Sequence, residues 1–127
     1  MKKLKGLSKG IGVENGFVEN STYWLVNDNR KIIGAINIRH RLNDFHLNYG
    51  GQIGYSVRPS ERRKGYTTEM LRMGLGTCKE MGFEKVLLCC KADNIGSVKT
   101  ITDNGGILSS ETILNGEKIQ RYWIILV

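Results

Sequence analysis

The stretch 57–71, VRPSERRKGYTTEML, constrains the fold most, because it runs from an apolar strand through a basic turn into an amphipathic helix. Gly65 permits a tight turn, and the first helical turn after it presents backbone N–H groups that have no partner within the helix. These groups lie at the positive end of the helix dipole and favour anions. Four basic residues oppose the single acidic residue Glu61: Arg58, Arg62, Arg63 and Lys64. The stretch therefore predicts an anion-binding turn suited to a phosphate.

The residues on both sides predict a βαβ unit around this turn. An alternating apolar pattern over 50–57 indicates a strand, and apolar residues at spacings of three and four over 66–81 indicate a helix that ends at Gly82. Residues 83–90 contain a continuous apolar run, which is typical of a strand covered on both faces. Because a helix of about 15 residues separates the two strands, we expect them to be parallel and joined by a right-handed crossover.

The remaining chain predicts two β-hairpins and a second helix. Residues 22–26 and 31–38 form the first hairpin around an Asn-Asp-Asn turn, and a helix over 94–104 stops at a Gly-Gly pair. Residues 107–114 and 118–127 form the last hairpin around Asn-Gly. Residues 1–20 are expected to be a weakly structured arm with a short helix or strand near 12–18, and 39–48 a loop or short irregular helix. The order predicts a single α/β or α+β domain over residues 1–127, with a mixed sheet.

Composition narrows the function classes. A chain of 127 residues buries enough surface to fold without disulfides or a metal ion, and its three cysteines are expected to be reduced thiols. A net charge of +7 favours anionic partners. Because the 19 Lys and Arg residues are spread along the chain without a basic, aromatic-lined stripe, a phosphorylated cofactor is favoured over nucleic acid. No apolar run approaches the length of about 20 residues that spans a bilayer, and the basic start lacks an export signal, so we expect a cytoplasmic protein.

The turn lacks the two commonest phosphate-binding patterns, GxGxxG and GxxxxGK[ST]. What it contains instead resembles motif A of the GNAT superfamily of N-acetyltransferases, with Arg62, Gly65 and Thr67 at the positions of the motif. Thr67 departs from the usual Gly or Ala. The resemblance extends to Asn94-Ile95-Gly96-Ser97 and Asn104-Gly105-Gly106, covers about residue 22 to the C-terminus, and is most specific over 51–106.

The resemblance implies a GNAT-like acyl-CoA N-acyltransferase fold whose sheet is mixed and mostly antiparallel, with the central parallel pair splayed around acetyl-coenzyme A. Backbone N–H groups of residues 63–68 would hold the pyrophosphate, the strand around 55–57 would pair with the pantetheine arm, and Asn94 would hydrogen-bond near the thioester. The cofactor-binding residues expected on this basis are Tyr55, Ser56, Val57, Arg62, Arg63, Lys64, Gly65, Tyr66, Thr67, Thr68, Asn94 and Ser97.

The catalytic groups are less determined. The family often places a tyrosine seven residues after the Asn94 position to protonate the departing thiolate, and this chain has Ile101 there. That role falls to Tyr66, Tyr55, Ser97 or water. For the base we consider His40, Glu61 and His46, with Asp93 behind them. The set we predict as catalytic is His40, Glu61 and Tyr66.

Cys89 and Cys90 suggest a covalent route, but we interpret them as core residues because they end the most apolar strand. Tyr122 and Trp123 are interpreted as core aromatics in the same way. No metal site is expected.

The function predicted is acetyl transfer from acetyl-coenzyme A to a primary amine of a small molecule or protein. The alternative is a non-catalytic coenzyme A-binding or interaction domain, which the residue Ile101 favours. Fewer residues precede the first predicted strand than is usual in the family, and the early helices of the family help to form the acceptor site. A second subunit would supply the missing wall, so a homodimer is expected.

Overall fold

The computed structural model describes residues 3–10, 20–61 and 65–126 of the chain. The strands of this part are β1 (Lys3–Gly10), β2 (Asn20–Val26), β3 (Ile32–Arg39), β4 (Ile53–Val57), β5 (Lys85–Lys91), β6 (Ile107–Leu114) and β7 (Glu117–Ile125). The helices are α1 (Tyr66–Glu80) and α2 (Ile95–Asp103), with two short turns of other helix types, η2 (His46–Gly50) and η3 (Pro59–Glu61). The order confirms both hairpins, both helices and the strands on either side of α1.

The prediction of a weakly structured arm over residues 1–20 is wrong for its first half. β1 pairs with β2 as an antiparallel strand, from Lys3 opposite Val26 to Gly10 opposite Asn20. Its sequence has no clear alternation, so the pairing with β2 and not an intrinsic pattern makes it a strand. The helix or strand predicted near 12–18 lies outside the described residues.

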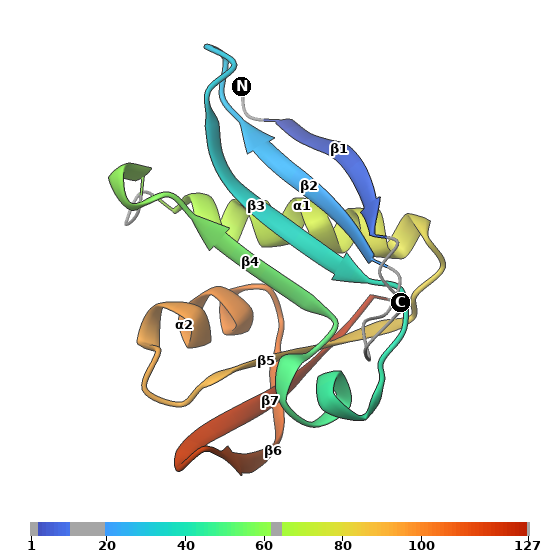
Figure 1. Cartoon of the computed structure of the whole chain (residues 1–127), viewed down its shortest axis with the longest axis vertical. Helices are drawn as coiled ribbons and strands as arrows, with labels where there is room; N and C mark the ends of the chain where they lie inside the picture. The colour runs from blue at the N-terminus through green and yellow to red at the C-terminus, as the bar shows by residue number, and fades with distance from the viewer. Residues whose placement is uncertain (1–2, 11–19, 62–64, 127) are drawn as a thin grey trace.

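The strands form two antiparallel sheets, one in the order β1-β2-β3-β4 and one in the order β5-β7-β6 (Figure 1). This confirms the α+β class but corrects the single mixed sheet. β4 and β5 run in similar directions (Figure 1), and the residue just before β4 meets β5, where Gln52 N–H donates to Leu87 O at 2.6 Å. Gly51 makes this close approach possible, because a Cβ there would lie 2.8 Å from Cys89 N. Beyond that point the expected parallel pair is fully separated.

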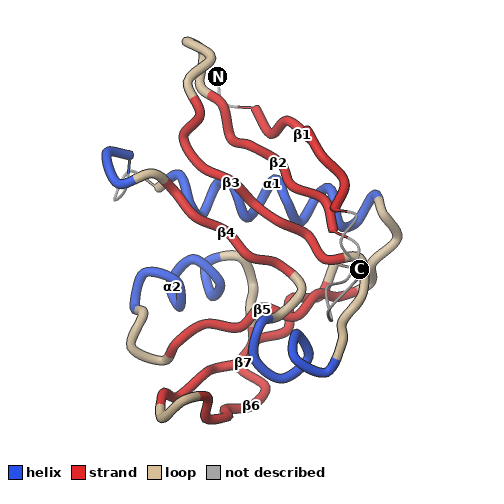
Figure 2. The backbone as a smooth tube through the Cα atoms, viewed as in Figure 1, coloured by secondary structure: helices blue, strands red, loops and turns tan. Residues whose placement is uncertain are grey.

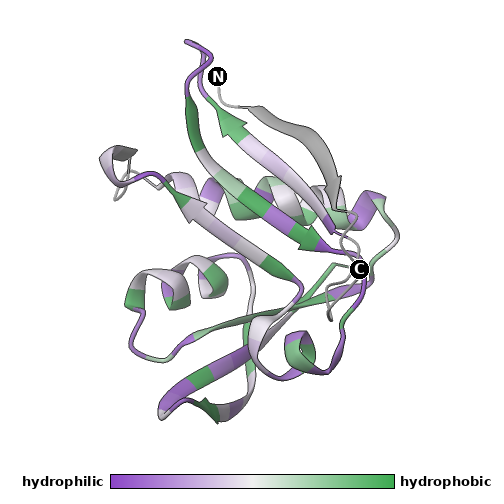
Figure 3. Ribbon diagram, in the orientation of Figure 1, coloured by the Kyte–Doolittle hydropathy of each residue, from purple (hydrophilic) through white to green (hydrophobic). Residues whose placement is uncertain are grey.

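Helix α1 covers one face of the first sheet and, with β5 and β7, encloses the core (Figure 2). Its apolar face carries Met70, Leu71, Leu75 and Cys78, all buried against the side chains of β3 and β4. Gly74 lies against the Ile36 side chain, so the lack of a side chain there allows a close approach of helix and sheet. The hydrophobic bands of β3, α1 and β5 accordingly lie towards the centre of the molecule (Figure 3).

A β-bulge changes the faces predicted for β3. Leu25 pairs with Gly34 and Val26 with Ile32, so Ile33 is the extra residue. Ile33 is therefore fully buried together with Ile36 and Ile38, while Ile32 is 42% exposed. Strict alternation along 31–38 predicts Ile32 on the face of Ile36 and Ile38 and Ile33 on the other face, and both positions are wrong because of the bulge.

Among the described residues, neither α-helix has the length and apolar character needed to cross a membrane.

Candidate functional site

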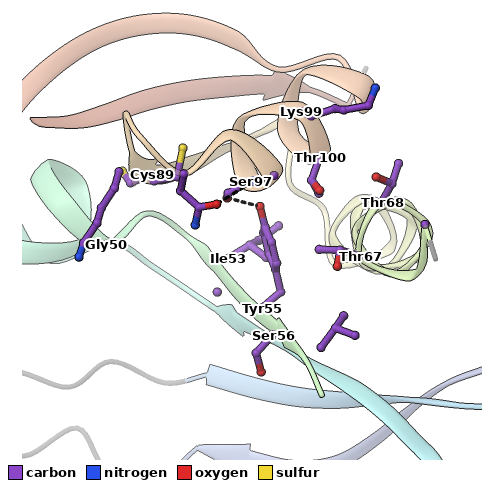
Figure 4. A pocket seen from close by; sticks show the side chains of 17 residues that line it. Gly50, Ile53, Tyr55, Ser56, Thr67, Thr68, Cys89, Ser97, Lys99 and Thr100 are labelled. Carbon is purple, nitrogen blue, oxygen red and sulfur yellow. Dashed lines mark hydrogen bonds between the residues drawn. The ribbon is translucent and has the colours of Figure 1, made fainter. Parts of the chain in front are cut away.

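A cavity of about 850 Å³ opens between β4 and β5, where the two sheets part. It is lined by Gly50, by Ile53 to Val57 of β4, by Gly65, Thr67 and Thr68 at the start of α1, by Cys89, Cys90 and Lys91 of β5, and by Asn94, Gly96, Ser97, Lys99 and Thr100 at α2. Figure 4 shows Thr67, Thr68 and Lys99 at one end and Gly50 and Cys89 towards the other. The cavity is thus elongated and differs in chemistry between its ends.

The long walls are the edges of two sheets. β4 and β5 each lie at the edge of a sheet on the side of the cavity, so within the described part of the chain no strand pairs with their outer edges. At the two ends of β4, Arg58 N–H donates to Ile33 O, and Gln52 O accepts from Arg39 N–H. Because the direction of backbone groups alternates along a strand, the N–H and C=O groups of the even-numbered residues point towards β3. The N–H and C=O groups of Ile53 and Tyr55 therefore face the cavity. An extended, amide-containing chain is the natural occupant of such an edge.

The basic turn forms the anion-favouring end. Gly65 has φ +80° and is the N-cap of α1, so it adopts the left-handed conformation for which a glycine was predicted. As a glycine it offers no side chain to cap the first helical turn, and Thr67 and Thr68 line the cavity just beyond it. Lys99 adds a cation from α2, although it also pairs with Asp103 at 3.0 Å. Helix dipole, backbone N–H groups and Lys99 together favour a phosphate at this end.

Side chains from β4 and α2 meet in the middle of the cavity. A hydrogen bond of 2.8 Å joins Tyr55 Oη and Ser97 Oγ (Figure 4). Burial raises the pKa of the Tyr55 phenol, and the hydrogen bond with Ser97 partly offsets this rise. Asn94 caps α2, because its side-chain Oδ1 accepts from Ser97 N–H at 3.1 Å, and so fixes the turn that carries Ser97.

The predicted catalytic residues lie away from this meeting point. His40 directly follows β3 and shares a 2.8 Å hydrogen bond with Ser21 Oγ, and it is not among the residues that line the cavity. Tyr66 packs half-buried against the core instead of lining the cavity. The side chain of Glu61 lies outside the described part of the chain, as do Arg62, Arg63 and Lys64.

His46, the third candidate base, lies in η2 outside the cavity lining. Its Nδ1 is buried without a hydrogen-bond partner among the described residues. Burial and the nearby Arg39 guanidinium lower its pKa, so the ring is neutral at neutral pH. Asp93 is exposed in the turn before α2.

The cysteines require a correction. Cys78 is buried, but Cys89 and Cys90 are only partly buried and line the cavity, because β5 is an edge strand and its far end faces the opening. Burial nevertheless raises the pKa of the Cys89 thiol to about 11 and also raises the pKa of Cys90. Both thiols are protonated at neutral pH, so neither is an activated nucleophile. Tyr122 is a core residue, as predicted, whereas the prediction is wrong for Trp123, which is only partly buried and lies under Lys85 Nζ.

Sequence reasoning missed several cavity residues on α2 and β5, among them Lys91, Gly96, Lys99 and Thr100. A signal existed for α2, since Gly96, Ser97, Lys99 and Thr100 make a small or polar stripe beside the apolar residues Val98 and Ile101. Lys91 gave no such signal. It forms an exposed ion pair with Glu117 at 2.9 Å.

Residues 8–107 match the family model described as "Acetyltransferase (GNAT) domain". The match covers most of the chain, so the protein belongs to the GNAT acetyltransferase family. No curated protein matches the sequence.

Solved structures share the fold at low sequence identity. An N152L mutant of spermidine N-acetyltransferase SpeG from Vibrio cholerae superposes with a TM-score of 0.76 at 10% identity, covering 98% of this chain and 94% of that one. Mutant forms of the spermidine/spermine N-acetyltransferase SpeG from the same organism give 0.75 at 12%, covering 99% and 95%. A chimera of SpeG from Vibrio cholerae and hSSAT gives 0.69 at 15%, covering 84% and 68%.

Proposed function

We propose that this protein is an N-acetyltransferase that moves an acetyl group from acetyl-coenzyme A to a primary amine of a small molecule or protein. The observation that carries the proposal is the cavity between β4 and β5, which joins the outer edge of β4 to the N-terminus of α1, where the N-cap residue Gly65 supplies no side chain. An extended amide chain that ends in a pyrophosphate needs these two features side by side.

The described residues fit coenzyme A. The backbone of Ile53 and Tyr55 would pair with the amides of the pantetheine arm, and the N–H groups of Thr67 and Thr68 would hold the pyrophosphate. Lys99 lies at the same end and would add a charge-assisted contact to phosphate. Asn94 and Ser97 line the middle of the cavity. We retain Ser56, Val57, Gly65 and Tyr66 as predicted contacts, with Arg62, Arg63 and Lys64 on the other side of the turn.

When bound, acetyl-coenzyme A supplies a thioester that an amine attacks directly. The chain must orient the thioester, accept or route a proton from the attacking nitrogen, and protonate the sulfur that leaves. No histidine or carboxylate lines the described part of the cavity wall. A base must therefore act from outside this wall. We keep His40 and Glu61 as the predicted bases and propose that they take the proton of the acceptor nitrogen through water. A direct transfer fits better than an acetyl-cysteine, because Cys89 and Cys90 are protonated at neutral pH.

The acceptor is proposed only as an amine. The similar solved structures are spermidine N-acetyltransferases, and spermidine is a polycation. In this chain the charged side chains of the described wall are the cations Lys91 and Lys99, which do not attract a polycation. An assay of acetyl transfer should therefore compare a panel of acceptors that contains spermidine, small monoamines and a lysine-containing peptide. The amine that is acetylated identifies the class of acceptor.

A non-catalytic coenzyme A-binding domain is the second candidate, because Ile101 stands fully buried at the position of the family tyrosine. Calorimetry with acetyl-coenzyme A, followed by a thiol-release assay across the panel, separates the two. We expect binding and thiol release that depends on the amine. Binding without release for every amine would leave the non-catalytic domain, and the lack of binding would remove both.

We further propose a cytoplasmic, single-domain protein that forms a homodimer. The support for self-association is β6, an edge strand with Ile107, Leu108 and Ile113 between 47% and 66% exposed. One of the similar structures is a dodecameric spermidine N-acetyltransferase from Vibrio cholerae. Sedimentation velocity should give a dimer, and a monomer at every concentration would contradict this.

A further inference from the structure

Helix α2 offers no phenol for the leaving thiolate. Ile101 is fully buried and packs in the core cluster with Leu71 and Tyr122. If the proposed transfer occurs, the proton for the sulfur must come from another side chain of the cavity wall or from water. Among the described residues, Tyr55 is the one tyrosine that lines the cavity, and it reaches from β4 to α2.

We infer that Tyr55, hydrogen-bonded to Ser97 across the cavity, is the general acid that protonates the leaving thiolate. The inference rests on the proposed function. The acceptor nitrogen forms the new bond to the acetyl carbon and releases a proton to water. As the carbon–sulfur bond breaks with its electron pair on sulfur, Tyr55 Oη gives its proton to the sulfur. Ser97 Oγ then passes a proton from water back to Tyr55, which restores the enzyme.

The chemistry of the wall favours Tyr55 over its neighbours. Ser97, Thr67, Thr68 and Thr100 also carry hydroxyls there, but an alcohol is a far weaker acid than a phenol, whose ordinary pKa is about 10. Tyr55 stays protonated at neutral pH, because burial raises its pKa. It can therefore donate throughout the neutral range.

The position of Tyr55 is fixed at both ends. Its backbone belongs to β4 and pairs with Ile36 of β3, and its hydroxyl is held at 2.8 Å from Ser97 Oγ. Ser97 is in turn held by the Asn94 cap at the start of α2. A proton donor that is oriented before the reaction loses little entropy when the reaction occurs.

The test compares Tyr55→Phe with Tyr23→Phe, which removes a phenol from strand β2 of the same sheet, at a residue packed against the core but outside the cavity lining. Loss of a general acid should lower kcat about 100-fold or more in Tyr55→Phe, with KM for acetyl-coenzyme A changed less than about 3-fold. Tyr23→Phe should keep the wild-type kcat. Urea denaturation of each variant establishes that it is folded.

A binding measurement tests the contact between Tyr55 and the sulfur of coenzyme A separately from turnover. The wild type should bind coenzyme A more tightly than desulfo-coenzyme A, and the ratio of the two affinities should fall to about one in Tyr55→Phe, as expected when the hydrogen bond to sulfur is lost. Equal weakening of both ligands, or a kcat within about 3-fold of wild type, would overturn the inference. If the wild type shows no turnover but the ratio still collapses, the proposed function fails while the contact of Tyr55 with the sulfur stands.

Ser97→Ala gives an independent signature in the pH profile. The hydrogen bond with Ser97 lowers the pKa of Tyr55 relative to burial alone, so its removal should move the alkaline limb of kcat to higher pH. A purely structural role for Ser97 predicts a limb that does not move, and that result would contradict the pairing of Ser97 with the acid.

Discussion

Gly65→Pro is the sharpest perturbation of the anion-binding turn. Gly65 holds φ at +80° in the structure, whereas proline fixes φ near about −65°. The chain entering α1 must then turn differently, so the N–H groups of Thr67 and Thr68 no longer point at the same place. Gly65 is exposed, and no atom of the described residues lies within 4 Å of a Cβ added there, so the core is not touched.

The expected loss of affinity follows from the contacts removed. Each hydrogen bond from a backbone N–H to a charged phosphate contributes about 1.5–3 kcal/mol. Losing the two from Thr67 and Thr68 removes about 3–6 kcal/mol, which corresponds to coenzyme A binding about 100-fold to 10,000-fold weaker. The free energy of unfolding should fall by only about 1–3 kcal/mol, the range of a local backbone effect.

Gly116→Pro is the matched control. Gly116 lies in the turn between β6 and β7, has φ +81°, and also has no atom within 4 Å of an added Cβ. Calorimetry with coenzyme A should show weak binding for Gly65→Pro and wild-type binding for Gly116→Pro, once urea denaturation shows that both are folded. Equal affinities in the two variants would refute the assignment of phosphate to this turn.

Three further predictions concern the core. Ile101→Tyr should lower the free energy of unfolding by about 1–3 kcal/mol without raising kcat, because Ile101 is fully buried and the larger phenol would overpack the core. A higher kcat with unchanged stability would contradict the buried position of Ile101. Gly106→Ala should lower the free energy of unfolding by about 1–3 kcal/mol, because the added Cβ would lie 2.8 Å from Ile101 O. Gly76→Ala is the control in the same urea assay and should be neutral or stabilising, because no atom of the described residues lies within 4 Å of the added Cβ. Burial raises the pKa of the Cys78 thiol to about 12, so the unfolded chain loses this proton first and the free energy of unfolding should fall as pH rises above about 9. The fall should be smaller in Cys78→Ala, and identical pH profiles would remove this explanation.

The elements with strong local signals were predictable. Gly65 at positive φ, the helix that follows it and the Asn94 cap of α2 each depend on residues that are neighbours in sequence. The same holds for the Asn115-Gly116 turn, where both residues have positive φ.

Features that depend on distant contacts were not predictable. β1 has no alternation of its own and is a strand only because β2 offers an edge. The burial of Ile33 depends on a bulge against Leu25, which no spacing in β3 reveals. The contact between the two sheets depends on Gly51, whose close approach to β5 brings together residues far apart in the chain.

The candidate site also contains residues that the sequence predicts and features that only the fold determines. The sequence predicts the turn at Gly65 and the residues Tyr55, Asn94 and Ser97, and in the structure they line one cavity. The exposure of Cys89 at that cavity was missed, because an apolar run does not show which end of a strand leaves the core. The contact between Tyr55 and Ser97 joins β4 to α2 and is a property of the fold.

The central claim is that coenzyme A occupies the opening between β4 and β5. A crystal structure of the protein with coenzyme A tests this most directly. We predict pantetheine amides paired with the β4 backbone at Tyr55, the pyrophosphate on the N–H groups of Thr67 and Thr68, and the sulfur within hydrogen-bonding distance of Tyr55 Oη. Coenzyme A bound elsewhere, with the edges of β4 and β5 unoccupied, would contradict the account.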